Sequence, residues 1–190
     1  MFIHPSPLFF AFLPLSFRLS TFNLYLYLYT MPVTYHPTPI GIVRITEEDN
    51  FISSVHFMDD EITLVAPETP LLNLAVKQLD EYFSGDRRVF DFPINQHGSN
   101  FQQEVWQCLL TINYGKTISY AHQSKLMNNP LAIRAIAAAN GKNHLAIIVP
   151  CHRVIGSDGS LTGYASGVWR KKWLLAHEAR VCGFGQATLF

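Results

Sequence analysis

The chain has 190 residues, of which 48% are hydrophobic and 15% are charged, and its formal net charge at pH 7 is zero. This length allows one or two small domains with a real hydrophobic core. The three cysteines form neither a CxxC motif nor a cluster with histidines, so the sequence indicates no metal site, and no cofactor is expected. Reduced thiols of this kind are typical of the cytosol or the nucleus.

The neutral total hides an acidic half and a basic half. Residues 31–98 carry four basic and eleven acidic side chains, whereas residues 99–190 carry nine basic and three acidic ones. A polyanion would be attracted by the second half and repelled by the first.

Residues 1–30 differ from the rest of the chain, because Arg18 is their only charged side chain and Phe and Tyr are crowded among them. They lack the basic start and the small residues of a secretory signal, and prolines interrupt any membrane-spanning helix. We expect Met31 to be the physiological start and residues 1–30 to be an extension outside the fold. A membrane-targeting segment is the alternative.

Residues 31–94 predict a small α+β domain. A helix is expected between an N-cap at Thr69, followed by Pro70, and a stop at Gly85. β-branched and aromatic runs predict two strands of a hairpin, a weaker third strand and one more strand after the helix: Ile40–Thr46, Phe51–Phe57, Ile62–Val65 and Val89–Phe92.

A linker at residues 95–100 precedes a second domain at residues 101–182, and residues 183–190 form a tail. The first helix of this domain begins near Phe101 and places Cys108 on its apolar face, so Cys108 is expected to be a core thiol.

Two short helices follow, Ser119–Leu126 and Leu131–Asn140, and a last helix spans Val168–Ala179. The turn between the short helices contains Asn129 as the expected N-cap and Pro130 as the first helical residue. Two helices joined by so short a turn predict a helix-turn-helix.

The segment Ile147–Gly156 carries the clearest chemical signal. Cys151 follows a short β-branched run, expected to be a strand, and Pro150, so its thiol is presented at a defined place. A thiol must lose its proton to attack, and His152 is the adjacent candidate base. Neighbours on an extended segment point to opposite faces, so a bridging water or a bend is needed. Glu178 is the candidate carboxylate to orient the histidine. The plain alternative is an inert buried thiol.

This segment and others in the same order resemble the O6-alkylguanine-DNA alkyltransferases, over the whole of their catalytic domain. The matching residues are Phe101-Gln102-Gln103-Glu104-Val105-Trp106, Ser119-Tyr120, Asn129-Pro130, Ala132, Arg134-Ala135, Asn143, Pro150-Cys151-His152-Arg153, Gly163-Tyr164, Trp173-Leu174-Leu175 and His177-Glu178. The N-terminal half is similar only in its strand-rich character and its length.

The resemblance implies an α+β fold, with a small N-terminal mixed sheet-plus-helix domain, ribonuclease H-like, followed by a winged helix-turn-helix catalytic domain. It implies irreversible, single-turnover transfer of an alkyl group from O6-alkylguanine, and O4-alkylthymine, in double-stranded DNA to Cys151. The base would be flipped out of the stack. A monomer without membrane contact is implied for the folded part, in the cytoplasm, or in the nucleus of a eukaryote.

The resemblance also implies residue roles. His152 would act through water, Glu178 would orient it, and Asn143 would brace the segment. Arg134 would enter the DNA stack, and Tyr120 would displace the 3′ phosphate and donate to guanine N3. The backbone carbonyls of Cys151 and Val154 would accept from the exocyclic amine. Further DNA contacts are expected at Ala132, Ala135, Lys125, Lys142 and Ser157, and the pocket is expected to be lined by Tyr120, Val154, Tyr164 and Ala165.

Two positions depart from the family pattern. Ala165 stands where some members carry a serine that can bond to O6, so we expect a backbone bond at most and room for bulkier lesions. Ile133 is bulkier than the alanine of some members, which alters the surface facing the DNA groove.

Two other function classes stay open from the residues alone. A helix-turn-helix regulator without chemistry would make Cys151 incidental. A cysteine hydrolase would need an oxyanion hole and a distant His/Asn pair, for which no motif stands out. Phosphate contacts are also expected from Lys116, Arg153 and the Arg170-Lys171-Lys172 run, and a solvated face is the alternative for this run.

Overall fold

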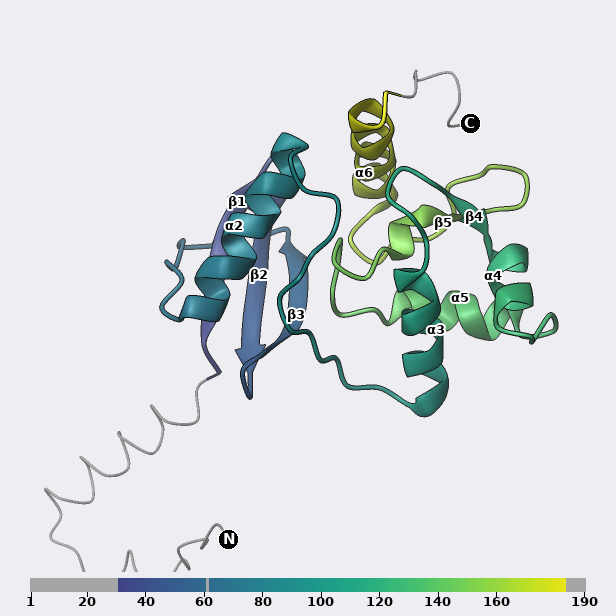
Figure 1. The fold of residues 1–190 in the computed structure, drawn as a ribbon, viewed down its shortest axis with the longest axis horizontal. Coiled ribbons are helices and arrows are strands. Elements are labelled where there is room, and N and C mark those ends of the chain that lie inside the picture. Colours follow the sequence, from purple (N-terminus) through teal and green to yellow (C-terminus); the bar gives the residue numbers. More distant parts are fainter. Residues whose placement is uncertain (1–30, 61, 184–190) are drawn as a thin grey trace, which may run out of the picture. The chain divides into compact units, whose positions relative to one another are not determined.

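A computed structural model describes residues 31–60 and 62–183. The extension at residues 1–30 and most of the expected tail lie outside these described residues. The account below concerns the compact unit that begins at Pro32, drawn in Figure 1. No helix of the described residues is long and apolar enough to cross a membrane.

The N-terminal part begins with a three-stranded antiparallel sheet of strand order β1-β2-β3. The strands are Val33–Thr38 (β1), Gly41–Glu48 (β2) and Phe51–Met58 (β3). Asp49 and Asn50 both have positive φ values, 52° and 64°, and form the tight turn between β2 and β3. Such a turn matches the twist of a hairpin, so this expected hairpin is confirmed.

Two other strand predictions are wrong. Ile62–Val65 is irregular, and the third strand is β1, at the start of the described chain. Val65 contributes only a carbonyl that accepts from Tyr35 N at 3.1 Å. Val89–Phe92 is also irregular, and the chain there contacts β3 through an isolated bridge between Ile52 and Ile94. Val65 and Val89 are exposed, and only Phe90 and Phe92 of these segments pack against the core, so β-branched composition alone did not make a strand here.

Helix α2 (Pro70–Ser84) lies across the sheet (Figure 1) and confirms the expected helix. The Thr69 hydroxyl accepts from Leu72 N, and Gly85 ends the helix at φ 95°, a conformation that glycine adopts without a Cβ penalty. The helix buries one face, made of Leu72, Ala75, Leu79 and Tyr82 with Gln78.

The second part is mostly helical. Its elements are α3 (Asn100–Leu110), β4 (Ile118–Ser119), α4 (Tyr120–Leu126), α5 (Ile133–Gly141), the 3-10 turn η2 (Cys151–Arg153), β5 (Val154–Ile155) and α6 (Val168–Val181). Ser99 caps α3 in a reciprocal capping box with Gln102. The short strands β4 and β5 pair in parallel and connect the start of α4 to the segment after Cys151.

Two details of the helix-turn-helix differ from expectation. Helix α5 begins at Ile133 with Ala132 as its N-cap, and neither Asn129 nor Pro130 takes part in the helix. Asn129 instead uses its carbonyl to accept from Ala132 N at 3.0 Å, so Pro130 and Leu131 lie in a turn that precedes the helix. A separate expectation, that Cys108 of α3 is a core thiol, is wrong, because its side chain is only half-buried.

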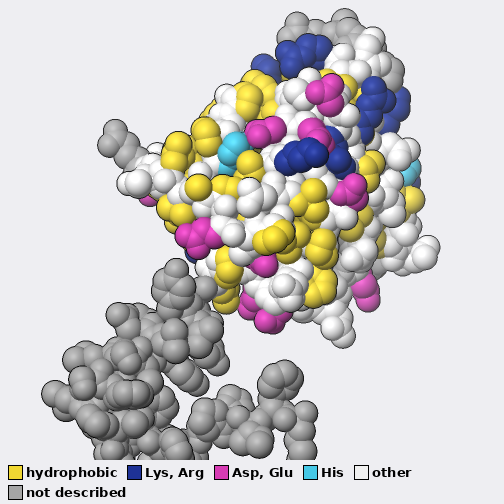
Figure 2. Space-filling model, turned by 60° about the vertical axis from the view of Figure 1, so that its left-hand side comes forward, with side chains coloured by type: hydrophobic (Ala, Val, Ile, Leu, Met, Phe, Trp, Pro, Cys, Tyr) yellow, Lys and Arg dark blue, Asp and Glu magenta, His cyan; other side chains and the backbone are white. Residues whose placement is uncertain are grey.

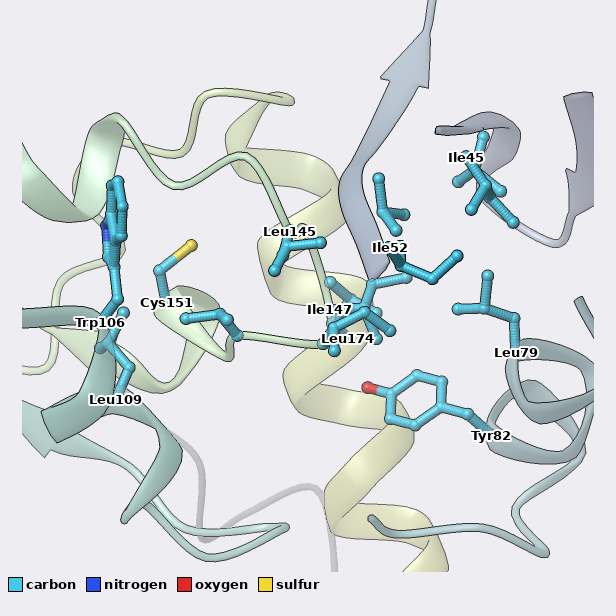
Figure 3. Packing of buried hydrophobic residues seen from close by; sticks show 14 of the residues in the cluster. Ile45, Ile52, Leu79, Tyr82, Trp106, Leu109, Leu145, Ile147, Cys151 and Leu174 are labelled. Atoms are coloured by element: carbon cyan, nitrogen blue, oxygen red, sulfur yellow. The ribbon is translucent and has the colours of Figure 1, made fainter. Parts of the chain in front are cut away.

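One hydrophobic core extends through both parts (Figure 3), from Ile45 and Leu79 to Leu145 and Trp106. β3 also bonds directly to the segment before the reactive cysteine. Val55 N donates to His144 O at 2.8 Å, and Ala146 N donates to Val55 O at 3.0 Å. The N-terminal part therefore supports the backbone that leads to Cys151.

The division of the sequence into an acidic and a basic half is less pronounced at the surface of the folded protein, because some of the basic side chains are buried. On the face shown in Figure 2, acidic side chains lie scattered among hydrophobic ones, and lysine and arginine gather toward the upper end. Arg153, Arg170 and Lys171, which belong to the basic half, are buried. The basic surface is therefore smaller than the sequence count indicates.

Candidate active site

A pocket of about 560 Å³ opens beside Cys151. It is lined by residues of α4, α5, η2 and the loop before α6: Tyr120, Ile133, Arg134, Ala137, Asn140, Gly141, Cys151, Thr162, Gly163, Tyr164 and Ala165. The helix-turn-helix and the reactive cysteine thus share one cavity. Cys151 itself is only 9% exposed, so a reagent must enter the pocket to reach the thiol.

The backbone before Cys151 is a tight turn, and the expected strand at Ile147–Val149 is wrong. Ile147 has φ 71°, a region that a β-branched residue rarely adopts because its side chain crowds the backbone. Val149 N donates to Leu145 O at 2.9 Å and Cys151 N to Val149 O at 2.8 Å, which closes successive turns. Non-local contacts hold this segment in a conformation that its β-branched composition does not favour.

Asn143 braces this turn and contacts the nucleophile. Its Nδ2 donates to Val149 O at 2.7 Å and lies 3.3 Å from Cys151 Sγ, and its Oδ1 accepts from Leu145 N at 3.0 Å. Burial raises the pKa of the Cys151 thiol, whereas the Asn143 hydrogen bond and the charge of Lys171 favour the thiolate. The side chain expected to brace the segment is therefore in position to do so.

His152 and Glu178 are completely buried and lie within hydrogen-bond distance, with His152 Nε2 at 2.9 Å from Glu178 Oε1. A proton on Nε2 that donates to the carboxylate leaves the lone pair of Nδ1 free to accept. Among the described residues Nδ1 has no hydrogen-bond partner. The η2 turn supplies the bend that an adjacent cysteine and histidine require. Burial lowers the pKa of His152 despite the opposing effect of Glu178, which favours the neutral base.

Arg153 neutralises Glu178 inside the protein. Its Nε and Nη2 donate to the two carboxylate oxygens at 2.9–3.2 Å, and its Nη1 donates to Ile112 O at 2.6 Å. Burial opposes ionisation of Glu178, but His152 and Arg153 outweigh it and keep the pKa of the carboxyl well below its usual range. Arg153 is thus a structural partner of the carboxylate, and its expected phosphate contact is wrong.

Lys171 is buried as well, so of the run Arg170-Lys171-Lys172 only Lys172 lies on a solvated face. Its Nζ donates to Val154 O at 2.7 Å and to Thr162 O at 3.1 Å, and so connects β5 to the pocket loop. Arg170 is paired with Asp59 and donates to Ile40 O, on the N-terminal part. Neither side chain is available to a phosphate in this arrangement.

The residues expected to meet DNA divide into two groups. Tyr120, Arg134, Tyr164 and Ala165 line the pocket, with Arg134 and Ala165 exposed. Outside the pocket lining are the exposed Ala135, Lys125, Lys142 and Ser157, the half-buried Ala132 and the buried Val154. The expected place of Val154 in the pocket wall is therefore wrong, and its carbonyl accepts from Lys171 Nζ at 2.7 Å.

Comparison with known proteins shows the family of the chain. Family models described as "6-O-methylguanine DNA methyltransferase, ribonuclease-like domain" and "6-O-methylguanine DNA methyltransferase, DNA binding domain" match residues 31–96 and 100–180. The chain belongs to the 6-O-methylguanine DNA methyltransferase family.

Relatives and solved structures of this family cover most of the chain. The constitutive methylated-DNA–protein-cysteine methyltransferase of Bacillus subtilis is 42% identical over 152 residues, which are 76% of this chain and 92% of the relative. The Methanosarcina acetivorans protein of the same name is 40% identical over 74% of this chain and 94% of the relative. The crystal structure of Mycobacterium tuberculosis O6-methylguanine methyltransferase matches with a TM-score of 0.72 and 37% identity, over 80% of this chain and 94% of that one.

A DNA complex exists for the same neighbour. The M. tuberculosis protein in complex with DNA matches with a TM-score of 0.72 and 39% identity, over 78% of this chain and 93% of that chain. The fold expected for the family, a small sheet domain followed by a helical DNA-binding domain, is therefore confirmed.

Sequence reasoning missed three groups that contact the surroundings of Cys151 and Glu178: the side chains of Lys171 and Tyr82 and the backbone of Gly115. Lys171 lies seven residues before Glu178, a spacing that places both on one face of α6, and this signal was available. Tyr82 donates to Glu178 Oε1 at 2.9 Å, and Gly115 N donates to Oε2 at 2.9 Å. Nothing in the local sequence of Tyr82 or Gly115 points to a carboxylate so distant along the chain.

Proposed function

We propose that this protein repairs DNA by transferring an alkyl group from O6 of alkylated guanine to Cys151. The observation that carries the proposal is the shared pocket. Cys151 lies in one cavity with Arg134 and Tyr120 of the helix-turn-helix, and the buried His152–Glu178 pair lies behind it. Family membership supports the same activity.

The chemistry follows from the contacts of the thiol. His152, through a water molecule at Nδ1, takes the proton of the Cys151 thiol, and the thiolate attacks the alkyl carbon. The Sγ–C bond forms as the C–O6 bond breaks, and the electron pair of that bond passes to O6. Guanine takes up one proton in exchange, so the products are ordinary guanine and S-alkylcysteine. Asn143 and Lys171 favour the thiolate in this step.

Base flipping is part of the proposal because Cys151 is buried at the base of the pocket. An O6 substituent inside a stacked duplex cannot reach such a thiol, and extrusion of a base costs a few kcal/mol. Arg134 is exposed on the rim of the cavity and is suited to occupy the vacated stack. Small side chains on α5, Ala135 and Ala138, are exposed beside it and permit close approach to a minor groove.

The substrate range is set by the pocket wall. Ala165 offers no hydroxyl, so the substrate O6 can bond only to backbone at this position, and bulkier alkyl groups fit more readily. We include O4-alkylthymine, because it presents an alkyl–oxygen bond of the same kind. We also propose that the protein acts as a monomer. Its place of action is the compartment that contains the DNA, which is the cytoplasm, or the nucleus in a eukaryote.

Each molecule reacts once, because the thioether formed at Cys151 does not release its alkyl group again. Cys108 and Cys182 are outside the pocket lining and offer no relay. The test is a titration of duplex DNA containing O6-methylguanine with rising amounts of protein, with the Cys151→Ala variant as control. We expect one lesion removed per wild-type molecule and none by the variant. Catalytic turnover, or repair by the variant, would refute the proposal.

A helix-turn-helix regulator without chemistry is the alternative. It would bind alkylated DNA and leave the lesion in place, and the same titration distinguishes the two. The buried His152–Glu178–Arg153 group favours the enzyme, since a pure binding protein has no need of an oriented base beside a thiol.

A further inference from the structure

Tyr82 connects the N-terminal part of the protein to the catalytic base. We propose that Tyr82 is a positioning residue that sets the basicity of His152, because both side chains share one acceptor, Glu178 Oε1. The inference rests on the proposed function, in which His152 takes the thiol proton. It assigns to α2 a part in the reaction, in addition to packing on the sheet.

The shared oxygen is the basis of the argument. Tyr82 Oη donates to Glu178 Oε1 at 2.9 Å, and His152 Nε2 lies 2.9 Å from the same atom. Arg153 Nη2 also donates to it at 2.9 Å, whereas Gly115 N uses the other oxygen, Oε2. In Figure 3 the Tyr82 hydroxyl points from α2 toward α6, the helix that carries Glu178.

Tyr82 is a constant donor at this position. The side chain is fully buried. Burial and the negative charge of Glu178 raise the pKa of the phenol well above its ordinary value, so the hydroxyl stays protonated over the whole working range of pH. A carboxylate oxygen has two lone pairs, and three side chains approach this one. Each donor therefore reduces the negative charge that the oxygen offers to His152.

Removal of the Tyr82 hydroxyl leaves the other charged groups around His152 and Glu178 in place. Arg153 and Lys171 are the cations that act on His152, and Glu178 is the anion. Burial and the charge of Glu178 in turn raise the pKa of Tyr82 on α2 and of Tyr114 in the loop after α3, and both phenols stay neutral. Cys151 precedes His152 in η2. His177 Nε2 of α6 donates to Tyr82 O at 2.8 Å, a backbone atom that the substitution keeps.

The direction of the effect follows from this competition. Without the Tyr82 hydroxyl, more of the negative charge of Oε1 acts on His152, and the imidazolium form is stabilised. The pKa of His152 then rises, and the acid limb of the alkyl-transfer rate moves to higher pH. We expect a shift of about half a pH unit, the order that one hydrogen bond supports.

Tyr82→Phe is the test, and Tyr114→Phe is its matched control. Tyr114 belongs to the same aromatic cluster, with its ring 5.8 Å from that of Tyr82. Among the described residues its buried hydroxyl has no hydrogen-bond partner, so its removal takes no donor from Glu178. Single-turnover rates on duplex DNA with O6-methylguanine are measured from about pH 5 to about pH 9, a range that brackets the ordinary pKa of histidine.

A second measurement makes the result independent of folding losses. The ring nitrogens of His152 are titrated by NMR in wild type, in Tyr82→Phe and in protein with 3-fluorotyrosine at position 82. A more acidic phenol donates more strongly, so the fluorinated protein shifts the pKa of His152 downward, opposite to the phenylalanine variant. A purely structural role would move neither value.

The outcomes separate this inference from the proposed function. The inference is supported if Tyr82→Phe moves the acid limb upward while Tyr114→Phe matches wild type. It is overturned if the two variants have the same pH profile, or if the two Tyr82 replacements shift His152 in the same direction. Absence of alkyl transfer in the wild-type protein would refute the proposed function itself, and the NMR titration would still report on the Tyr82–Glu178–His152 contact.

Discussion

Replacement of Arg153 by methionine tests the buried charge arrangement behind Cys151. The guanidinium makes a forked contact with Glu178, and the side chains of the pair are 9% and 0% exposed. Methionine keeps much of the volume but removes the positive charge, so Glu178 becomes a buried carboxylate held by His152, Tyr82 and Gly115 only. We expect Arg153→Met to lower the free energy of unfolding by about 3–5 kcal/mol at pH 8, the cost of removing one partner of a buried pair.

The pH dependence of that loss identifies its cause. In the variant, His152 becomes the remaining cation for Glu178, so its pKa in the folded state rises above the unfolded value. A group of this kind stabilises the fold fully below its unfolded pKa, about 6.5, and the contribution is lost as the pH rises through the folded pKa. In wild type burial lowers the pKa of His152, so its protonation disfavours the folded state at low pH. The difference in stability between the two proteins therefore shrinks as the pH falls from about 8 to about 5.5.

Urea unfolding of wild type, Arg153→Met, Glu178→Gln and the double variant measures both effects. Removal of both charges leaves no isolated buried ion, so we expect the double variant to lose less stability than the sum of the single losses, by about 1–3 kcal/mol. Additive losses, or a deficit of Arg153→Met that stays constant with pH, would refute the reasoning.

Three further predictions concern the nucleophile and the DNA. Asn143→Ala removes the hydrogen bonds to Val149 O and Cys151 Sγ, and should cost about 1–3 kcal/mol in urea unfolding and raise the thiol pKa, measured by iodoacetamide reactivity against pH; an unchanged thiol profile would remove Asn143 from the site. Arg134→Ala should slow repair of duplex DNA by about 1–3 kcal/mol in activation free energy while sparing free O6-benzylguanine, because only the duplex must be held open; equal losses would show that Arg134 acts on the alkylated base itself and not on the duplex. Lys142→Glu, just after α5, should weaken binding to undamaged duplex and make the slope of log K against log salt less steep by about 0.9, whereas Lys77→Glu on α2 should not; equal effects would contradict DNA binding through the helix-turn-helix.

The elements with local signals were predictable from the sequence. Helix α2 has its cap and stop in Thr69 and Gly85, and the hairpin has its turn in Asp49-Asn50. Helix-turn-helix spacing was recognisable for the same reason. The start of α5 was misplaced because Asn129-Pro130 is an equally good turn signal, and the structure uses it as a turn.

The parts of the site that depend on distant contacts were not predictable. The turn at Ile147 has a positive φ that its own side chain disfavours, so the surrounding structure imposes it. Burial of Lys171 and Arg153 could not be inferred from a basic run, because only the folded arrangement supplies their carbonyl and carboxylate partners. The contact of Tyr82 with Glu178 joins residues 96 positions apart.

Mass spectrometry of the protein after reaction with duplex DNA containing O6-methylguanine tests the central claim most directly. The peptide that contains Cys151 should gain one methyl group, while the peptides that contain Cys108 and Cys182 stay unmodified. The gain should saturate at one methyl per molecule, and the recovered DNA should contain unmodified guanine. A methyl group on another cysteine, or intact lesions with unmodified Cys151, would contradict the account.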